Sequence, residues 1–480
     1  MSGLPPGPRL PRLVQTAGFI VGGVRFLEAC RRRYGGAVTL GTLFDSGFVM
    51  VFDPALVKEL FQGSNDQLHA GEANALLGPV LGERSVLLLD GAEHLRHRRL
   101  MLPAFHGAQI RSWVGAMQEA ADLEIDRWPV GEPFPIFTSM QSLTLRVIIR
   151  VVFGYPPGPA ADELQRRVRA MIEPVARPRG LLLAQLLMRF GDRGERRAIT
   201  QFEAQRAAVD ELLYAEIARR RAEPDLAERT DVFSALLLAE DQQGQHLSDR
   251  EVRDELVTLL LAGHETTAVG LAWTFDLLLH SPAVHERASE GDDEYLDAVV
   301  KEALRLRPVI PAVGRVVRGT PFKLGRYEIP PGYEINPSIR VIHRRGDLYP
   351  EPHAFRPERF LVPDPPDTYT WIPFGGGTRR CLGASFALLE MRVVLRRVLE
   401  RAALRAAEPS PEEPTFRGIT LAPRGGVRVV QDRAPGEPRS TRQQIATVSD
   451  SLASAATPSE LSQSPMSSLI AGRPTERESA

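Results

Sequence analysis

A cysteine that follows a glycine-rich run is the feature of this sequence best suited to chemistry. The run reads FGGGTRRCLG, and its thiol, Cys381, stands just before a predicted helix. Backbone amides and a helix N-terminus favour a thiolate at such a position. The glycines permit a tight bend and the close approach of something large and flat. The segment therefore predicts a functional thiolate.

Several chemistries could use that thiolate. One thiolate cannot build a tetrahedral zinc site, and no second cysteine is near, because Cys30 is the only other one. A single thiolate suffices as the axial ligand of haem iron, where it pushes electron density toward O–O cleavage. The alternatives are a nucleophilic cysteine with a His or Asn partner and an inert buried thiol. We interpret Cys30, at the end of a predicted first helix, as a small buried apolar residue.

A second polar group lies inside a long apolar helix. The helix is predicted over residues 248–280, from a Ser-x-x-Glu capping box to Ser281-Pro282. Its centre is apolar almost all round and must run through the interior, yet it contains Ala-Gly-His-Glu-Thr-Thr at 262–267. The structural alternative is a pair of threonines that bond back to helix carbonyls, beside a glutamate that reaches solvent.

The cysteine segment resembles the haem-binding signature of the cytochrome P-450 family, Phe-x-x-Gly-x-Arg-x-Cys-x-Gly. The matching residues are Phe374, Gly377, Arg379, Cys381 and Gly383. Three further motifs follow in the family's order, so that the resemblance covers residues 35–430. It implies haem b (iron protoporphyrin IX) as cofactor and Cys381 as iron ligand. The residues that would contact the haem near this ligand are Phe374, Gly375, Arg379 and Gly383.

Residues 262–267 resemble the family's oxygen-activation motif. The resemblance implies that Ala262 and Gly263 form a groove for dioxygen. It also implies that the Thr266 hydroxyl relays protons that Glu265 supplies from solvent. His264 has no assigned role, since the family places other residue types there.

The other matching motifs position the cofactor. Glu302-x-x-Arg305, with both side chains on one helix face, and Arg359 form the family's structural triad. By resemblance, His94 and Arg98, four residues apart on one helix face, bind the haem propionates together with Arg315 and Arg379. We interpret their neighbours on the same predicted helix as an ordinary solvated face: Arg96, His97 and Arg99.

The element pattern predicts a mainly α protein with a smaller β region (α+β). The resemblance implies the P-450 fold, with haem buried between the long central helix and the cysteine loop. We expect residues 1–34 to form a lead-in and first helix, 35–431 a single catalytic domain, and 432–480 a disordered tail rich in Ser, Thr, Pro and Gln. Predicted helices are 54–62, 92–102, 108–128, 137–153, 160–176, 195–222, 231–240, 293–306 and 383–405. Predicted strands are 37–40 and 48–52 as a hairpin, pieces of 315–341, 415–420 and 426–430. Residues 281–295 are shorter than usual for the family, which would trim a peripheral helix.

Composition narrows the function classes. The chain has 480 residues, a formal net charge of −1 and 43% hydrophobic residues, which is ordinary globular composition without bulk attraction to nucleic acid or anionic membrane. Two cysteines exclude a disulfide framework and favour a reducing compartment, the cytoplasm. The apolar run 13–27 is interrupted by Gln15 and Arg25, so we expect no membrane span. Arginine far exceeds lysine, which favours a bacterial source.

The resemblance implies a haem-thiolate monooxygenase that inserts one atom of O2 into a lipophilic molecule by hydroxylation or epoxidation. A terpenoid, steroid or fatty acyl substrate is expected. By resemblance, its pocket would be lined by residues 65–85, Val269 and 309–313. A peroxide-driven peroxygenase is an alternative, disfavoured by the Glu265–Thr266 pair. A haem-thiolate gas sensor or ligand carrier is another.

Electrons must come from a separate protein, since the sequence has no flavin or nicotinamide fingerprint. We expect a ferredoxin-type or flavodoxin-type donor with its reductase, serving a monomer. A basic helix face after Cys381 would steer such an acidic donor. The residues of this face are Arg392, Arg396, Arg397 and Arg401, with Arg380 beside the ligand.

Overall fold

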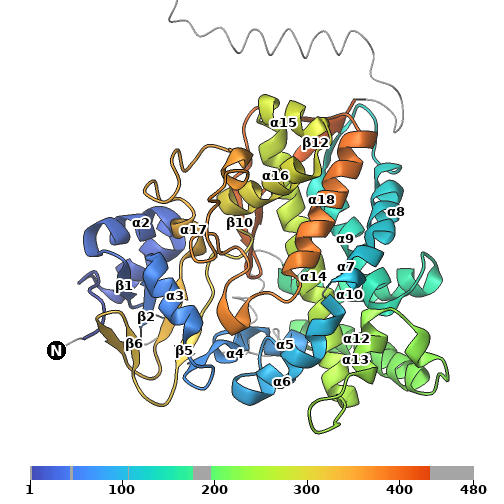
Figure 1. Cartoon of the computed structure of the whole chain (residues 1–480), viewed down its shortest axis with the longest axis horizontal. Helices are drawn as coiled ribbons and strands as arrows, with labels where there is room; N and C mark the ends of the chain where they lie inside the picture. The colour runs from blue at the N-terminus through green and yellow to red at the C-terminus, as the bar shows by residue number, and fades with distance from the viewer. Residues whose placement is uncertain (1–2, 44–46, 106, 177–195, 433–480) are drawn as a thin grey trace, which may run out of the picture. The chain divides into compact units, whose positions relative to one another are not determined.

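The computed structural model describes residues 3–43, 47–105, 107–176 and 196–432. The predicted tail lies outside this part of the chain, apart from Asp432. Helices dominate one side of the described part, and the largest sheet lies on the other (Figure 1). The mainly α, α+β class is therefore confirmed.

The helices follow the predicted pattern closely. The longer ones are α2 (Gly23–Tyr34), α3 (Pro54–Gln62), α6 (Gly91–Met101), α8 (Val114–Ile125), α9 (Ile136–Phe153), α10 (Pro159–Ala176), α12 (Arg196–Arg221), α14 (Asp249–Leu279), α15 (Pro282–Ser289), α16 (Asp293–Leu306) and α18 (Ala384–Arg401). Shorter segments are α1 (Arg12–Ala17), η1 (Gly18–Gly22), α4 (Ala70–Ala73), η2 (Ala75–Leu77), α5 (Gly78–Leu81), η3 (Leu102–Phe105), α7 (Ala108–Ser112), η4 (Leu226–Glu228), α13 (Val232–Leu238), α17 (Ile339–Ile342), η5 (Pro357–Phe360) and η6 (Gly377–Arg379).

Local signals explain where key helices begin. The Asp53 carboxylate accepts a hydrogen bond from the Ala55 amide at the start of α3. Ser248 and Glu251 form the predicted capping box of α14. The prediction over 108–128 is wrong in one respect, because the helix breaks at Trp113 into α7 and α8. The last helix also ends earlier than predicted, at Arg401.

The strands form one larger sheet and three small ones. The larger sheet has the order β1 (Ala37–Leu40), β2 (Phe48–Val51), β8 (Glu334–Pro337), β5 (Arg315–Val317) and β3 (Leu68–His69), with β2 and β8 parallel and the other pairs antiparallel. The predicted hairpin β1–β2 is confirmed. The small sheets are β4 (Pro133–Pro135), β12 (Arg428–Gln431) and β9 (Leu404–Ala406); β10 (Pro414–Arg417) with β11 (Thr420–Pro423); and β6 (Phe322–Leu324) with β7 (Tyr327–Ile329). The single strand predicted over 415–420 is instead the β10–β11 hairpin, which turns at Gly418.

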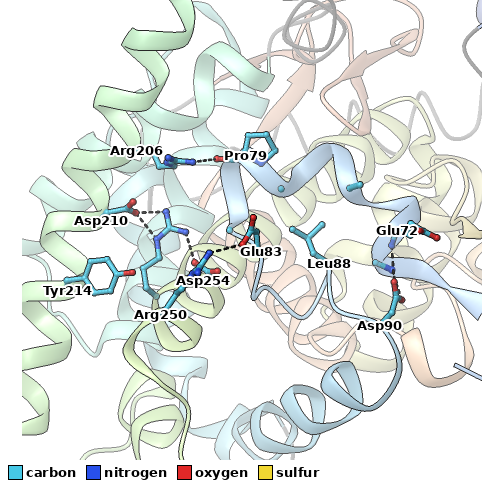
Figure 2. A pocket seen from close by; sticks show the side chains of 15 residues that line it. Glu72, Pro79, Glu83, Leu88, Asp90, Arg206, Asp210, Tyr214, Arg250 and Asp254 are labelled. Carbon is cyan, nitrogen blue, oxygen red and sulfur yellow. Dashed lines mark hydrogen bonds and ion pairs between the residues drawn. The ribbon is translucent and has the colours of Figure 1, made fainter. Parts of the chain in front are cut away.

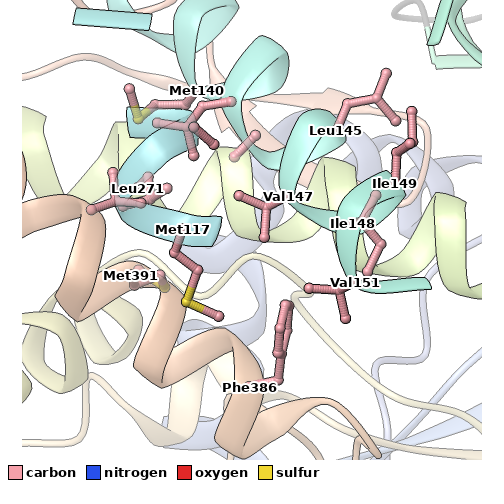
Figure 3. Packing of buried hydrophobic residues seen from close by; sticks show 14 of the residues in the cluster. Met117, Met140, Leu145, Val147, Ile148, Ile149, Val151, Leu271, Phe386 and Met391 are labelled. Carbon is pink, nitrogen blue, oxygen red and sulfur yellow. The ribbon is translucent and has the colours of Figure 1, made fainter. Parts of the chain in front are cut away.

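The main core forms where α14 runs between α9 and α18. Aliphatic side chains of α9, among them Val147 and Ile148, belong to one buried cluster with Leu271 of α14 and with Met391 and Phe386 of α18 (Figure 3). Burying such side chains is worth about 1.5–3 kcal/mol each. The packing fixes α14 in the interior, as its apolar centre predicted.

Three described helical stretches are long and apolar enough to cross a membrane: Arg12–Tyr34, Ile136–Phe153 and Asp249–Leu279. The last two are largely buried in the core, which accounts for their composition. The first is mostly uncovered, at 22% buried. By length and composition this first stretch is a candidate span, although Gln15 and Arg25 interrupt its apolar run.

Candidate active site

The loop before Cys381 has a backbone that favours glycine. Gly375 and Gly377 have φ of +66° and +65°, in the left-handed region. The Cys381 amide donates a hydrogen bond to the Phe374 carbonyl over 3.0 Å and closes the loop. The thiol is thus held just before α18.

Two of the loop glycines are needed for packing against protein. A Cβ at Gly376 would lie 2.1 Å from the Phe61 ring of α3, and one at Gly377 would lie 2.0 Å from the Phe61 carbonyl oxygen. We expected the glycines to admit a large flat group, and at these two positions that prediction is wrong. At Gly383, no described atom lies within 4 Å of a hypothetical Cβ, so the chain is open there.

The Cys381 thiol is accessible, yet protein surrounds it. Its residue is exposed, while burial raises the pKa of the thiol, opposed by a backbone hydrogen bond from Gly383 and the charges of Arg98 and Arg380. The exposure of the residue and the effect of burial on its pKa agree if the thiol faces a space inside the protein. The expected thiolate is therefore not favoured by the protein alone, and a bound cation such as a metal ion would have to stabilise it.

Four basic side chains from three parts of the chain meet near this thiol. His94 and Arg98 come from α6, Arg315 from β5 and Arg379 from the cysteine loop. Burial and the charges of the three arginines lower the pKa of His94 to about 3. Burial and the charge of Arg379 lower the pKa of Arg315 to about 10. Burial and the charge of Arg98 lower the pKa of Arg379 to about 10, although Asp90 opposes this shift.

This cationic cluster (His94, Arg98, Arg315 and Arg379) carries more positive than negative charge. Its ion-pair partner in the described structure is Asp90, whose Oδ1 lies 2.5 Å from Arg379 Nη2. His94 Nδ1 and Arg379 Nε are buried without a hydrogen-bond partner among the described residues. Sequence reasoning missed Asp90. A dianionic ligand beside the thiol would satisfy these groups.

One face of α14 is open at its centre. Ala262 is exposed and Thr266 half-buried, although the helix around them is buried. The Thr266 hydroxyl donates to the Ala262 carbonyl over 2.6 Å. A Cβ at Gly263 would lie 2.8 Å from Ile148 of α9. Packing against α9 therefore explains Gly263 better than the expected oxygen groove.

Glu265 is not the solvent-facing acid we expected. It is 8% exposed, and its two oxygens accept from Arg417 Nε at 2.6 Å and Gln141 Nε2 at 2.8 Å. The unassigned His264 lies buried with Nδ1 3.0 Å from the Thr144 hydroxyl. Burial lowers the pKa of His264 to about 4, so it is neutral.

Comparisons with known proteins decide the family. The family model described as Cytochrome P-450 matches residues 4–427. The chain belongs to the cytochrome P-450 family. The family is one of haem-thiolate monooxygenases, so this P-450 is an oxidoreductase enzyme with a haem-thiolate cofactor that works with O2, a substrate and redox partners.

Several mycobacterial proteins are similar to this chain. It is 42% identical to cytochrome P-450 135B1 of Mycobacterium bovis over 440 residues, which cover 89% of this chain and 91% of the relative. It is 40% identical to cytochrome P-450 135A1 of Mycobacterium tuberculosis, covering 91% and 97%. Among solved structures, a cyanobacterial P-450 120A1 with bound retinoic acid superposes with a TM-score of 0.75 at 23% identity, covering 90% of this chain and 99% of that one. That likeness supports the fold.

The structural triad of this P-450 is fully formed. Arg305 donates to both Glu302 oxygens at 2.7 Å, and Arg359 Nε lies 3.2 Å from Glu302 Oε1. Glu302 and Arg305 are wholly buried. Arg305 also bonds the carbonyls of His343, Pro352 and Ala354, so it ties the coil before the cysteine loop to α16.

The solvated-face interpretation of α6 is wrong for two of its three residues. His97 is 2% exposed, with Nδ1 2.7 Å from Glu255 Oε1 and Nε2 3.1 Å from Glu251 Oε1. Arg96 pairs with Asp241 and Glu251 at 2.6 and 3.1 Å. Only Arg99 of the three is exposed. These acidic partners could not be predicted from the sequence, because they lie about 150 residues from α6 along the chain.

The expected substrate lining is partly revised. Val269 is wholly buried in the core and Val309 is 8% exposed, whereas Ile310 and Val313 are half-buried. Residues of the 65–85 stretch line a cavity of about 840 Å³ between α4, α5, α12 and α14, but charged side chains also line it (Figure 2). Arg206 bonds the Pro79 carbonyl at 3.0 Å and Arg250 pairs with Glu83 at 2.8 Å across it. The cavity also reaches Asp90, the partner of Arg379.

The basic face of α18 is neutralised. Arg392 and Arg396 pair with Asp297 and Asp293 at 3.4 and 2.5 Å. Arg397 and Arg401 share Asp122 at 2.6 and 2.8 Å. These four arginines thus hold α18 to α16 and α8, which weakens the expectation that they steer a donor. Arg380 is exposed and has no ion pair among the described residues.

Proposed function

We propose that this P-450 inserts one oxygen atom from O2 into a C–H or C=C bond of a lipophilic small molecule. Electrons would come from a separate ferredoxin-type or flavodoxin-type donor with its reductase, in the cytoplasm. The observation that carries the proposal is the cationic cluster beside an accessible thiol. Haem b fits there, because its two propionates would neutralise the excess positive charge.

When bound, haem b supplies the iron chemistry that activates O2. The chain's own residues would hold it: Cys381 would ligate the iron through its sulfur, and His94, Arg98, Arg315 and Arg379 would bind the propionates. The open face at Ala262 leaves space for a small molecule. Thr266 holds a proton at Oγ1, which it donates to the Ala262 carbonyl. We assign the proton supply to Glu265, which must first exchange Arg417 for solvent.

The substrate is proposed as terpenoid, steroid or fatty acyl. The half-buried apolar side chains Ile310 and Val313 support a lipophilic body. The cavity that reaches Asp90 is lined by charged side chains. It supports a substrate that carries a hydroxyl or carboxyl group at one end of its lipophilic body.

One observation favours the peroxide-driven alternative. The ion pair between Glu265 and Arg417 restrains the carboxylate on which O2-dependent proton delivery would depend. The two functions separate in turnover assays. Product formed with O2 and an electron donor, but not with hydrogen peroxide alone, supports the monooxygenase; the reverse supports the peroxygenase.

The first test is the absorbance of the reduced protein exposed to carbon monoxide. We expect the strongly red-shifted Soret band of thiolate ligation in the wild type and in Cys30→Ser, the matched control, but not in Cys381→Ser. A band typical of histidine ligation that survives Cys381→Ser would refute the ligand assignment. Folded protein without haem would refute the proposal as a whole.

A further inference from the structure

The N-terminal helical segment buries polar side chains and exposes aliphatic ones. Its polar residues Gln15 and Thr16 face the protein at 8% and 6% exposure. Its aliphatic residues face outward, with Leu13 at 65%, Ile20 at 62% and Val21 at 87% exposure. A water-facing helix normally shows the opposite pattern.

The polar side chains that face inward are hydrogen-bonded to backbone groups. Gln15 Nε2 donates to the Leu10 carbonyl at 2.8 Å, and its Oε1 accepts from the Gly41 amide at 3.0 Å. The Thr16 hydroxyl accepts from the Leu43 amide at 3.0 Å. The bonds from Gly41 and Leu43, in the loop that follows β1, fix the rotation of the helix. Gln15 therefore does not interrupt the outward apolar surface. The expected absence of a membrane span is untouched by this, because it concerned crossing a membrane and not contact with its surface.

The exposed residues lie in one stripe. They are Leu10, Leu13, Val14, Ala17, Ile20 and Val21, at spacings of three and four. We call this the N-terminal stripe. A side chain on the opposite face, Phe19, packs edge-on against Phe48 of β2 with ring centroids 5.4 Å apart. The stripe is thus held outward by the fold.

Charge around the stripe has one sign. Arg9, Arg12 and Arg25 are exposed beside it, and residues 3–27 contain no Asp or Glu, although the whole chain has a net charge of −1. Apolar and basic side chains on one surface are typical of helices that lie in an anionic membrane interface.

We propose that the N-terminal stripe docks this protein on the surface of an anionic lipid bilayer. The segment from α1 through η1 has 11 residues before the chain turns at Gly23, whose φ is +50°. At about 1.5 Å per residue it reaches only about 16 Å, half of a ~30 Å bilayer core, so it lies in the interface and does not span.

A second copy of the chain is a poorer occupant. Stable interfaces use about 20–30 residues a side, far more than this stripe offers. A two-fold contact would also bring the same arginines of both copies together. The proposal concerns the outer surface and does not depend on the haem chemistry.

The test uses the full-length, haem-loaded protein in vesicle co-sedimentation. Vesicles of phosphatidylcholine alone are compared with vesicles that also contain phosphatidylglycerol. We expect wild-type binding to the anionic vesicles at low salt, reduced at least about tenfold by Ile20→Ser with Val21→Ser. The matched control, Leu238→Ser with Val362→Ser, removes two exposed aliphatic side chains elsewhere (44% and 47% exposed) and should bind as wild type.

Charge and folding give independent readouts. Arg9→Gln with Arg12→Gln should weaken binding to anionic vesicles mainly at low salt. Circular dichroism melting establishes that each variant is folded. The proposal is overturned if wild type binds neither vesicle at low salt, or if the control pair loses binding equally. It is also overturned if light scattering shows a dimer that Ile20→Ser with Val21→Ser converts to monomer while vesicle binding is unchanged.

Discussion

Buried positive charge that exceeds its negative counter-charge identifies the residues that await a ligand. Arg315 is 7% exposed. Its burial and the charge of Arg379 both lower its pKa. Desolvation and like-charge repulsion both oppose folding of the ligand-free protein. The same residues gain when an anion arrives. Removing one of them should therefore have opposite effects on the free and loaded protein.

We expect Arg315→Met to leave the ligand-free protein as stable as wild type or slightly more stable, because a buried repulsive charge is gone. Haem should leave the variant about ten to a hundred times faster, since a charge-assisted hydrogen bond is worth about 1.5–3 kcal/mol. Thermal melting of apoprotein and haem transfer to an excess of apomyoglobin measure the two effects. Arg326→Met, an exposed arginine on the turn before β7, is the control. A loss of apoprotein stability with unchanged haem release would contradict the assignment.

Thr266 has a matched partner on its own helix. Thr274 makes the same bond to the carbonyl four residues back, at 2.8 Å, but is wholly buried. We expect Thr266→Ala to consume NAD(P)H at near the wild-type rate while releasing hydrogen peroxide in place of product, because the open face loses its proton donor. Thr274→Ala should keep its product yield per electron. Equal yields in wild type and Thr266→Ala would show that the hydroxyl is structural.

Elements at this site are joined by pairs that lie far apart in the chain. Helix α6, which carries His94 and Arg98, is tied to α14 through His97, Glu255 and Glu251. Glu255 also accepts from the Val86 amide at 2.8 Å. Burial raises the pKa of Glu255 to about 7. Burial alone would lower the pKa of His97, but the hydrogen bonds to the two glutamates outweigh it and raise the pKa.

Both shifts make the folded protein bind protons more tightly than the unfolded chain. The stability they contribute is therefore greatest below pH 4.5, the ordinary pKa of Glu, and falls as pH rises through about 7. His97→Gln keeps a hydrogen-bond donor but cannot titrate. We expect it to lower the free energy of unfolding by about 1–3 kcal/mol at pH 5 and by less at pH 8. Denaturant unfolding across this range measures the slope, with exposed His246→Gln as control. Parallel curves for wild type and His97→Gln would exclude the ion pair.

Local signals made most elements predictable. Asp53-Pro54 starts α3 and the Ser248–Glu251 box starts α14, because each involves backbone groups within four residues. The long-range partners of His97, Glu265 and Arg397 could not be predicted. Each is more than 100 residues away, and no local spacing records which helix faces another. The site motifs were found because they are short and contiguous, whereas Asp90 was missed because its role arises only from the fold.

At the scale of the whole molecule, charge is arranged more by structure than by composition. Arginines that looked like a free basic face on α18 are neutralised by acids of α8 and α16, and so contribute to packing. Arg380 beside the ligand loop is exposed and has no ion pair among the described residues. Long-range steering depends on such uncompensated charge, so this place should dominate the electrostatics of donor association.

Electron donor docking tests this view. Arg380→Glu reverses an exposed charge next to Cys381, and we expect it to slow reduction by an acidic ferredoxin about tenfold at low salt, with the difference shrinking at high salt. Arg396→Glu should instead break the ion pair with Asp293 and lower the melting temperature, with a smaller effect on the reduction rate. Stopped-flow reduction across ionic strength, paired with thermal melts, separates the two. If Arg396→Glu slows reduction more than Arg380→Glu while its melting temperature is unchanged, then α18 and not the ligand loop meets the donor, and the ion pairs seen here open in solution.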